Sequence, residues 1–350
     1  MPLELELCPG RMIGGDHPCF IIAEIGQNHQ GDIKIAKEMI RKVKVRGMDC
    51  FSVSQLKGKF LEPAKNRPST SKPSYTRSFG KVYNHFWKTL AHEKFLKLQD
   101  YSSDLQIKVK ISWFVSQMAV EFLHQLNVPF FKVGSGDTNN FTYLERTAQK
   151  GRPMVISSGM QSMETMRRVY QTVKPLNPNF CILQCTAYPL EPEDVNLRII
   201  TTNLEGEFLS VVFNRVMMGT LAWVQGLALG FYLILREVAI YMSGKSLPFP
   251  STVLPSTVSK LILLGGEYYC LLPQKDECLF KLGKSVVAKV AICTGTVLTA
   301  DMFTVKVADP KGIAPEDLFQ LVGKKATADI GGDESVTEDA VENHGKKGKC

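Results

Sequence analysis

The stretch VPFFKVGSGD, residues 128–137, joins a short apolar run to a polar loop that contains two glycines. The same design recurs at Phe20–Ile25, Met154–Ile156 and Cys181–Leu183, each of which is followed by a polar or glycine-bearing loop. These runs are apolar without alternation, as expected for parallel strands that are buried on both faces. The last three runs start roughly 26 residues apart, which is about the length of one βα unit. The pattern therefore predicts repeated βα units.

Helical patterns separate these runs. Apolar side chains from Ile33 to Val43 fall on one face of a helix, and Thr142 with Glu145 forms a capping box that predicts the start of another helix. We therefore expect a parallel α/β fold, specifically a (β/α)8 barrel of the TIM type with ligands at the C-terminal ends of the strands. An open doubly wound sheet is the alternative. No GxGxxG motif follows a strand, so a dinucleotide-binding fold has little support.

The composition limits the functional classes. The chain has 350 residues, which is enough for one large domain and a small one. Its formal net charge of +8 mildly favours anionic ligands such as phosphates or carboxylates. Because the basic residues are spread along the chain, we expect no nucleic-acid partner. Residues 1–8 lack the features of a secretory signal, and the nine cysteines show no paired spacing, so we expect a cytoplasmic protein with reduced thiols.

A second unit begins where the composition changes, near residue 280. Val286–Val290 and Thr304–Val307 predict short strands, and Pro315–Phe319 predicts a single helical turn. We therefore expect a barrel over residues 1–275 and a small β-rich domain over residues 281–345.

Four motifs, in the same order along the chain, resemble those of the sialic acid synthase family, and most closely its vertebrate type. They are EIGQNHQGD at residues 24–32, FKVGSGD at 131–137, VISSGM at 155–160 and CTAYP at 185–189. Residues 281–350 are similar to the antifreeze-like SAF domain that follows the barrel in this family. The resemblance therefore implies a TIM-type barrel with a C-terminal SAF domain.

The resemblance also implies a transferase of carbohydrate biosynthesis. In this family phosphoenolpyruvate condenses with N-acetylmannosamine, or with its 6-phosphate, to give N-acetylneuraminate, or its 9-phosphate, and phosphate. C3 of phosphoenolpyruvate attacks the sugar aldehyde, water adds at C2, and phosphate leaves by C–O cleavage. A Mg2+ or Mn2+ ion polarises the aldehyde. The family resemblance further implies a homodimer, in which the SAF domain covers the mouth of the partner's barrel.

The resemblance assigns roles to residues at the ends of the expected strands. It implies that the catalytic residues are Glu24, Asp137 and Tyr188. It implies that the substrate-binding residues are Asn28, Lys132, Ser135, Ser157 and Ser158. An ammonium group and hydroxyls suit the phosphate and carboxylate of phosphoenolpyruvate, and a carboxylate near the sugar suits proton transfer. Each residue also has a purely structural interpretation, as a solvated lysine, a turn residue or a packed strand end.

The chain departs from the family where the metal should be held. The family's two metal-ligating histidines belong to the segment 201–275, but here no histidine lies between His124 and His344. The family's Lys-Phe-Gln motif after the second strand is also missing, at Phe51–Gln55. We therefore expect no metal ligands, interpret residues 201–275 as a degenerate part of the barrel, and predict an impaired activity.

Other interpretations stay open. The chain could be a non-catalytic relative that acts as a binding or dimerisation subunit, or the product of a decayed or wrongly assembled gene. Residues 216–235 carry no charge over the length of a membrane span, which allows a membrane-anchored variant. Because this run contains three glycines and a glutamine, and because the resemblance is to enzymes without a span, we do not expect a membrane contact.

Overall fold

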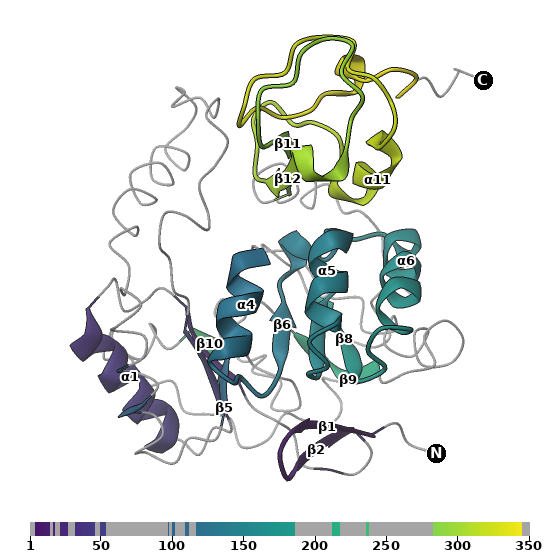
Figure 1. Cartoon of the computed structure of the whole chain (residues 1–350). Coiled ribbons are helices and arrows are strands. Elements are labelled where there is room, and N and C mark those ends of the chain that lie inside the picture. The colour runs from purple at the N-terminus through teal and green to yellow at the C-terminus, as the bar shows by residue number, and fades with distance from the viewer. Residues whose placement is uncertain are drawn as a thin grey trace, which may run out of the picture.

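The computed structural model describes residues 4–14, 17, 22–26, 32–45, 50–53, 97, 100–101, 109–111, 117–185, 212–217, 236–237 and 283–344. Figure 1 shows parallel strands with helices α4, α5 and α6 beside them, and a C-terminal module above the ends of these helices. The loop that follows β6 (Phe131–Val133) lies on the side that faces this module, since Asp137 of that loop accepts from Lys284.

Eight strands of the described part form two four-stranded parallel sheets, in the orders β10-β3-β4-β5 and β6-β7-β8-β9. They are β3 (Ile22–Gly26), β4 (Cys50–Val53), β5 (Val109–Ile111), β6 (Phe131–Val133), β7 (Met154–Ser157), β8 (Phe180–Cys185), β9 (Val212–Met217) and β10 (Arg236–Glu237). Each strand lies beside its successor in the chain within a sheet, and the last strand lies beside the first. This is the strand order of a (β/α)8 barrel.

The apolar runs become strands because both of their faces are buried. Every residue of β6 and of β7 is buried, as are the first four residues of β8. The register aligns Phe131 with Met154, and Met154 with Phe180, so that large side chains lie at the same level in three neighbouring strands. Phe180 also packs against Tyr170 of the outer helix layer, with ring centroids 5.7 Å apart.

Helices α1 (Ile33–Val45), α4 (Gln117–Gln125), α5 (Phe141–Ala148) and α6 (Met163–Val173) follow strands. The predicted apolar face of α1 is confirmed, because Ala36, Met39 and Ile40 are buried. The predicted capping box of α5 is wrong. The helix begins earlier, with Asn140 as its N-cap, whose side-chain oxygen accepts from the N–H of Tyr143. In the preceding turn the backbone N–H of Asn140 donates to the carbonyl oxygen of Asp137, with an N–O distance of 3.0 Å. This bond holds Asn140 at the start of the helix, where it can act as the N-cap.

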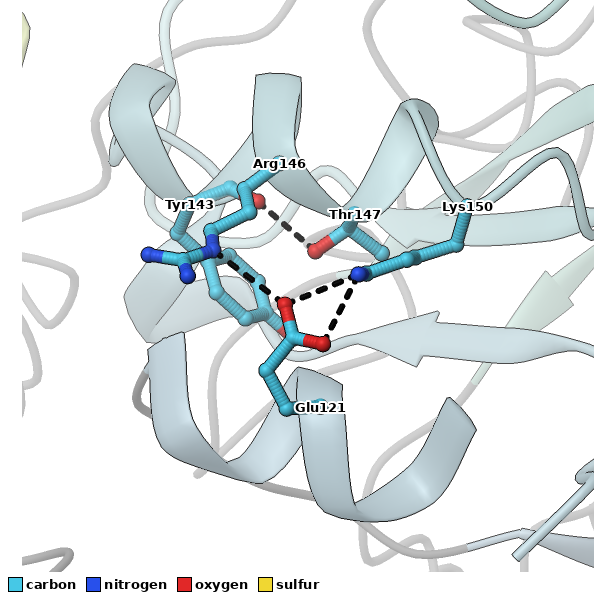
Figure 2. Close-up of polar contacts among 5 residues, drawn as sticks. All are labelled: Glu121, Tyr143, Arg146, Thr147 and Lys150. Atoms are coloured by element: carbon cyan, nitrogen blue, oxygen red, sulfur yellow. Dashed lines mark hydrogen bonds and ion pairs between the residues drawn. The ribbon is translucent and has the colours of Figure 1, made fainter. Parts of the chain in front are cut away.

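A half-buried ion-pair network ties α4 to α5 and to Lys150 just after α5, as Figure 2 shows. Glu121 of α4 accepts from Lys150 at 2.8 Å and from Arg146 at 3.4 Å. The hydrogen bond from Lys150 is the largest of the effects that hold the pKa of Glu121 below its usual range. Tyr143 lies on the inner side of α5, and burial raises the pKa of its hydroxyl. The network therefore belongs to the outer helix layer, away from the strand ends.

The C-terminal module is built from short elements around a compact core. Strands β11 (Ser285–Ala288) and β12 (Phe303–Lys306) pair antiparallel, and the single helical turn is observed as a 3-10 turn at Pro315–Asp317 followed by α11 (Leu318–Leu321). Its buried apolar side chains come from all parts of the module, among them Val286, Leu298, Phe303, Leu321 and Val336. Gly312 permits close packing, because a Cβ there would lie 2.3 Å from the carbonyl oxygen of Val336.

The N-terminal residues form a hairpin of β1 (Glu4–Cys8) and β2 (Arg11–Gly14). The alternating leucine and glutamate pattern explains it, since Leu5 and Leu7 are buried while Glu4 and Glu6 are exposed.

Part of the segment 201–275, interpreted above as degenerate, forms strands. β9 and β10 occupy the seventh and eighth places of the barrel, beside β8 and β3. Pairing with these neighbours supplies the order that the local pattern lacks. The other residues of this segment, including most of the apolar run 216–235, lie outside the described residues. Among those described, no helix is long and apolar enough to cross a membrane.

Candidate functional site

Strand β6 carries a lysine at its central position. Lys132 lies between Phe131 and Val133 and is aligned with Val155 of β7. Its side chain is only 2% exposed. A buried ammonium group is costly unless polar or anionic groups compensate it. A lysine in this position is therefore suited to a negatively charged ligand.

The loop after β6 turns tightly over the strand end. Ser135–Asp137 form a 3-10 turn in which the N–H of Asp137 donates to the carbonyl of Gly134 at 2.9 Å. Ser135 is half-buried, whereas Asp137 is buried. The next residue, Thr138, donates its hydroxyl to the carbonyl of Ser157 at 2.6 Å. This bond joins the end of the β6 loop to the end of β7.

The loop after β7 is in turn bonded to β8 and back to the loop after β6. Ser157 and Ser158 are fully buried, and the N–H of Ser158 donates to the carbonyl of Leu183 in β8 at 2.9 Å. The side-chain amide of Gln161 donates to the carbonyl of Ser135 at 3.0 Å and to that of Gly159 at 3.3 Å. The two loops are thus linked in both directions, and they form one polar edge.

Asp137 has a partner from a distant part of the chain. Its carboxylate accepts from the ammonium group of Lys284, which directly precedes β11 of the C-terminal module. Burial lowers the pKa of Lys284, and the Asp137 carboxylate opposes this effect. The same carboxylate adds to the burial that raises the pKa of Tyr143. Asp137 therefore faces the inner side of α5 and the module.

The remaining predicted residues are only partly described. Glu24 lies in β3, where the register aligns it with Ser52 of β4 and with Glu237 of β10. The side chain of Glu24 lies outside the described part of the structure, as do Asn28 and Tyr188 entirely. The structure thus links the loops that carry four of the predicted residues, namely Ser135, Asp137, Ser157 and Ser158, at the ends of β6 and β7, and it buries Lys132 within β6.

Sequence reasoning missed Thr138, Gln161 and Lys284. Thr138 and Gln161 each directly follow a predicted motif, so their position next to a strand end was a usable signal. No local signal pointed to Lys284, because its partner is 147 residues away. The assembled groups, an ammonium and several hydroxyls at the ends of parallel strands, are those that bind phosphates and carboxylates.

Comparisons with known proteins cover both units of the chain. The sequence profile of the NeuB family matches residues 39–234, more than half of the chain, and that of the SAF domain matches residues 283–342.

Two relatives match along the full length. The chain is 52% identical over 360 residues to N-acetylneuraminate-9-phosphate synthase of Homo sapiens, which covers 99% of each protein. It is 52% identical over 363 residues to the protein of the same name from Mus musculus, which covers 100% of each.

The fold has a solved counterpart. It is similar to that of Spore coat polysaccharide biosynthesis protein spsE from Bacillus subtilis, with a TM-score of 0.69 at 21% identity, over 97% of this chain and 99% of that one. The predicted TIM-type barrel followed by a SAF domain is thereby confirmed, and the chain belongs to the NeuB family.

Proposed function

We propose that this protein is a sialic acid synthase that condenses phosphoenolpyruvate with N-acetylmannosamine 6-phosphate and water to give N-acetylneuraminate 9-phosphate and phosphate. The observation that carries the proposal is the 52% identity, over 99% of the chain, to N-acetylneuraminate-9-phosphate synthase. Phosphoenolpyruvate contributes three carbons, so C6 of the sugar becomes C9 of the product. A 9-phosphate in the product of the relatives therefore favours the 6-phosphate over the free sugar as substrate.

The polar edge of β6 and β7 supports the anion-binding half of this proposal. Lys132, Ser135, Ser157 and Ser158 are the groups that we propose to hold the phosphate and carboxylate of phosphoenolpyruvate. The hydrogen bonds of Thr138 and Gln161 keep the two loops together without a ligand. Binding then requires little rearrangement of the backbone.

The sugar side of the site is proposed from the resemblance. Glu24 and Tyr188 are the proposed catalytic residues that position the sugar and move its proton, with Asn28 beside the substrate. Asp137 is also a proposed catalytic residue, and in the structure its carboxylate is engaged by Lys284. Its contribution in this arrangement is to hold the β6 loop in place.

The described residues do not fit the Mg2+ or Mn2+ ion that the family resemblance implies. Among them no three His, Cys, Asp or Glu side chains converge in a way that could hold a metal ion. The two family histidines are missing from the sequence as well. We therefore propose that this chain turns over slowly, on the order of 10⁴-fold below an intact relative, since losing metal polarisation of the aldehyde costs several kcal/mol of transition-state stabilisation.

The assembly and location are further parts of the proposal. We propose a cytoplasmic homodimer with a barrel over residues 1–275 and a SAF domain over 281–345. In support, Cys181 and Cys293 are not in disulfide bonds. Light scattering of the purified chain tests the dimer.

Calorimetric titration with phosphoenolpyruvate tests the site. Lys132→Met removes the charge with little change in size, and we expect it to weaken binding by about tenfold or more. The matched control is Lys150→Met, because Lys150 binds Glu121 in the outer helix layer. This control should bind phosphoenolpyruvate like the parent. Equal affinity of Lys132→Met and the parent would contradict the assignment.

Phosphate release in the presence of phosphoenolpyruvate, Mn2+ and N-acetylmannosamine 6-phosphate tests the activity. We expect a slow but measurable rate. A rate close to that of the human relative would uphold the function and refute the impairment. Absence of both phosphoenolpyruvate binding and turnover would instead favour a non-catalytic binding or dimerisation subunit.

A further inference from the structure

A single peptide group joins two of the proposed ligand-binding residues. It connects Ser157, the last residue of β7, to Ser158, and both residues are fully buried. Its N–H, which belongs to Ser158, donates to the carbonyl of Leu183 in β8 at 2.9 Å. Its carbonyl, which belongs to Ser157, accepts from the hydroxyl of Thr138 at 2.6 Å. The peptide group is therefore held from two sides, by β8 and by the loop after β6.

Thr138 supplies its donor at the level where the neighbouring strand has ended. β6 ends at Val133, which is aligned with Ile156, so Ser157 lies one residue beyond the last aligned pair. The turn after β6 brings the hydroxyl of Thr138 to this level, where it takes the part of a backbone donor of the strand. The carbonyl of Gly134 lies 3.3 Å from the same hydroxyl. Because a hydroxyl donates one hydrogen bond, the shorter distance assigns this bond to Ser157.

The bonds on this peptide group set the direction of both serine side chains. A peptide group is planar, so a hydrogen bond at its carbonyl and another at its N–H fix the orientation of the whole plane. The side chains of Ser157 and Ser158 start from the two ends of that plane. Thr138 is fully buried, and its branched Cβ restricts rotation of its hydroxyl. Without that hydroxyl, the buried carbonyl would turn toward water or another donor, and the plane would rotate with it.

We infer that Thr138 is a positioning residue of the anion site, which holds the peptide group between Ser157 and Ser158 in the orientation that binds phosphoenolpyruvate. In this role Thr138 acts through the carbonyl of Ser157 and makes no contact with the ligand itself. The consequence for phosphoenolpyruvate rests on the proposed function, whereas the ordering of the peptide group does not. The two parts are therefore tested by different measurements.

Hydrogen exchange of the Ser158 amide on the full chain tests the ordering without a ligand. Thr138→Val keeps the shape of the side chain but removes the hydroxyl. In this variant we expect the Ser158 amide to exchange about tenfold faster, relative to the amide of Ile156 in the same strand, than in the parent. The ratio within one strand cancels a general loss of stability, because such a loss speeds both amides alike.

Calorimetric titration with phosphoenolpyruvate tests the role in binding. We expect Thr138→Val to raise the Kd about tenfold, and Thr138→Ser, which retains the hydroxyl, to stay within about threefold of the parent. The matched control is Thr147→Val. Thr147 is also fully buried, but its hydroxyl donates to the carbonyl of Tyr143 at 2.7 Å within α5 (Figure 2). This control should leave both the Kd and the exchange ratio as in the parent.

A second pair of variants covers the case in which Thr138→Val does not fold. Thr138→Ser and Thr138→Ala both lack the methyl group and differ from each other only in the hydroxyl. Thr138→Ala should therefore bind phosphoenolpyruvate more weakly than Thr138→Ser and show the faster exchange of Ser158. Equal affinity of these two variants would overturn the inference.

The failure of the proposed function is distinguishable from the failure of this inference. If the parent binds phosphoenolpyruvate and a folded Thr138→Val binds it equally well, the positioning role is overturned. If the parent does not bind phosphoenolpyruvate, the proposed function fails, and the exchange ratio decides whether Thr138 orders the peptide group. An unchanged ratio in Thr138→Val would then overturn that ordering as well.

Discussion

Single buried polar side chains hold the proposed site together, and Gln161 shows this most clearly. It is 4% exposed, and its side-chain amide donates hydrogen bonds to two backbone carbonyls, one in the β6 loop and one in the β7 loop. Gln161→Leu keeps the approximate size but removes the amide donor to these two carbonyls. We expect the free energy of unfolding to fall by about 1–3 kcal/mol, measured as a shift of the urea midpoint. Gln171→Leu, at an exposed position of α6, should change it by less than about 0.5 kcal/mol. Equal shifts for the two variants would contradict this role.

At the scale of the element, the structure and the sequence pattern assign different residues to the N-cap of α5. The structure makes Asn140 the N-cap, whereas the sequence pattern pointed to Thr142. Asn140→Ala removes the acceptor for the N–H of Tyr143 and should destabilise the protein by about 1 kcal/mol. Asn140→Ser should retain most of the stability, because serine is also a good N-cap. Thr142→Ala, inside the first turn, is the control with little expected effect. Thermal melting checks all three variants. A larger loss of stability in Thr142→Ala than in Asn140→Ala would contradict Asn140 as the N-cap and favour the predicted capping box.

At the scale of the whole molecule, contacts between the module and the barrel contribute to stability. The contribution of Glu316 to these contacts depends on pH. Burial is the largest effect on its carboxyl group and raises its pKa above the ordinary value. The folded state therefore holds this proton more tightly than the unfolded state does. The stabilising contribution is fully present below the ordinary pKa of a glutamate, about 4.3, and is lost as the pH rises through the raised value.

Glu316→Gln removes this titration. Between about pH 4 and pH 7 we expect the urea midpoint of the parent to fall relative to that of the variant. Glu338→Gln, at an exposed position of the same module, controls for the loss of one carboxylate from the net charge. A constant difference between parent and Glu316→Gln across this range would refute the prediction.

Local pattern by itself determined several elements of this protein. The runs around Phe131, Met154 and Phe180 are strands because uninterrupted apolar sequence is stable only when both faces of the strand are covered. The buried stripe of α1 follows in the same way from helical periodicity. Because the carboxyl ends of parallel strands meet at one edge, the sequence also predicted that Lys132, Ser135 and Ser157 would lie together.

Only the tertiary structure decided which distant residues meet. The pairing of β10 with β3, the ion pair of Lys284 with Asp137, and the contact of Glu316 with Asn139 join residues that are far apart in the chain. Period and propensity describe neighbours within one element, so they carry no information on such contacts. The energy of a buried charge pair exists only when the folded chain has excluded water from both partners, and this is why the sequence alone could not reveal it.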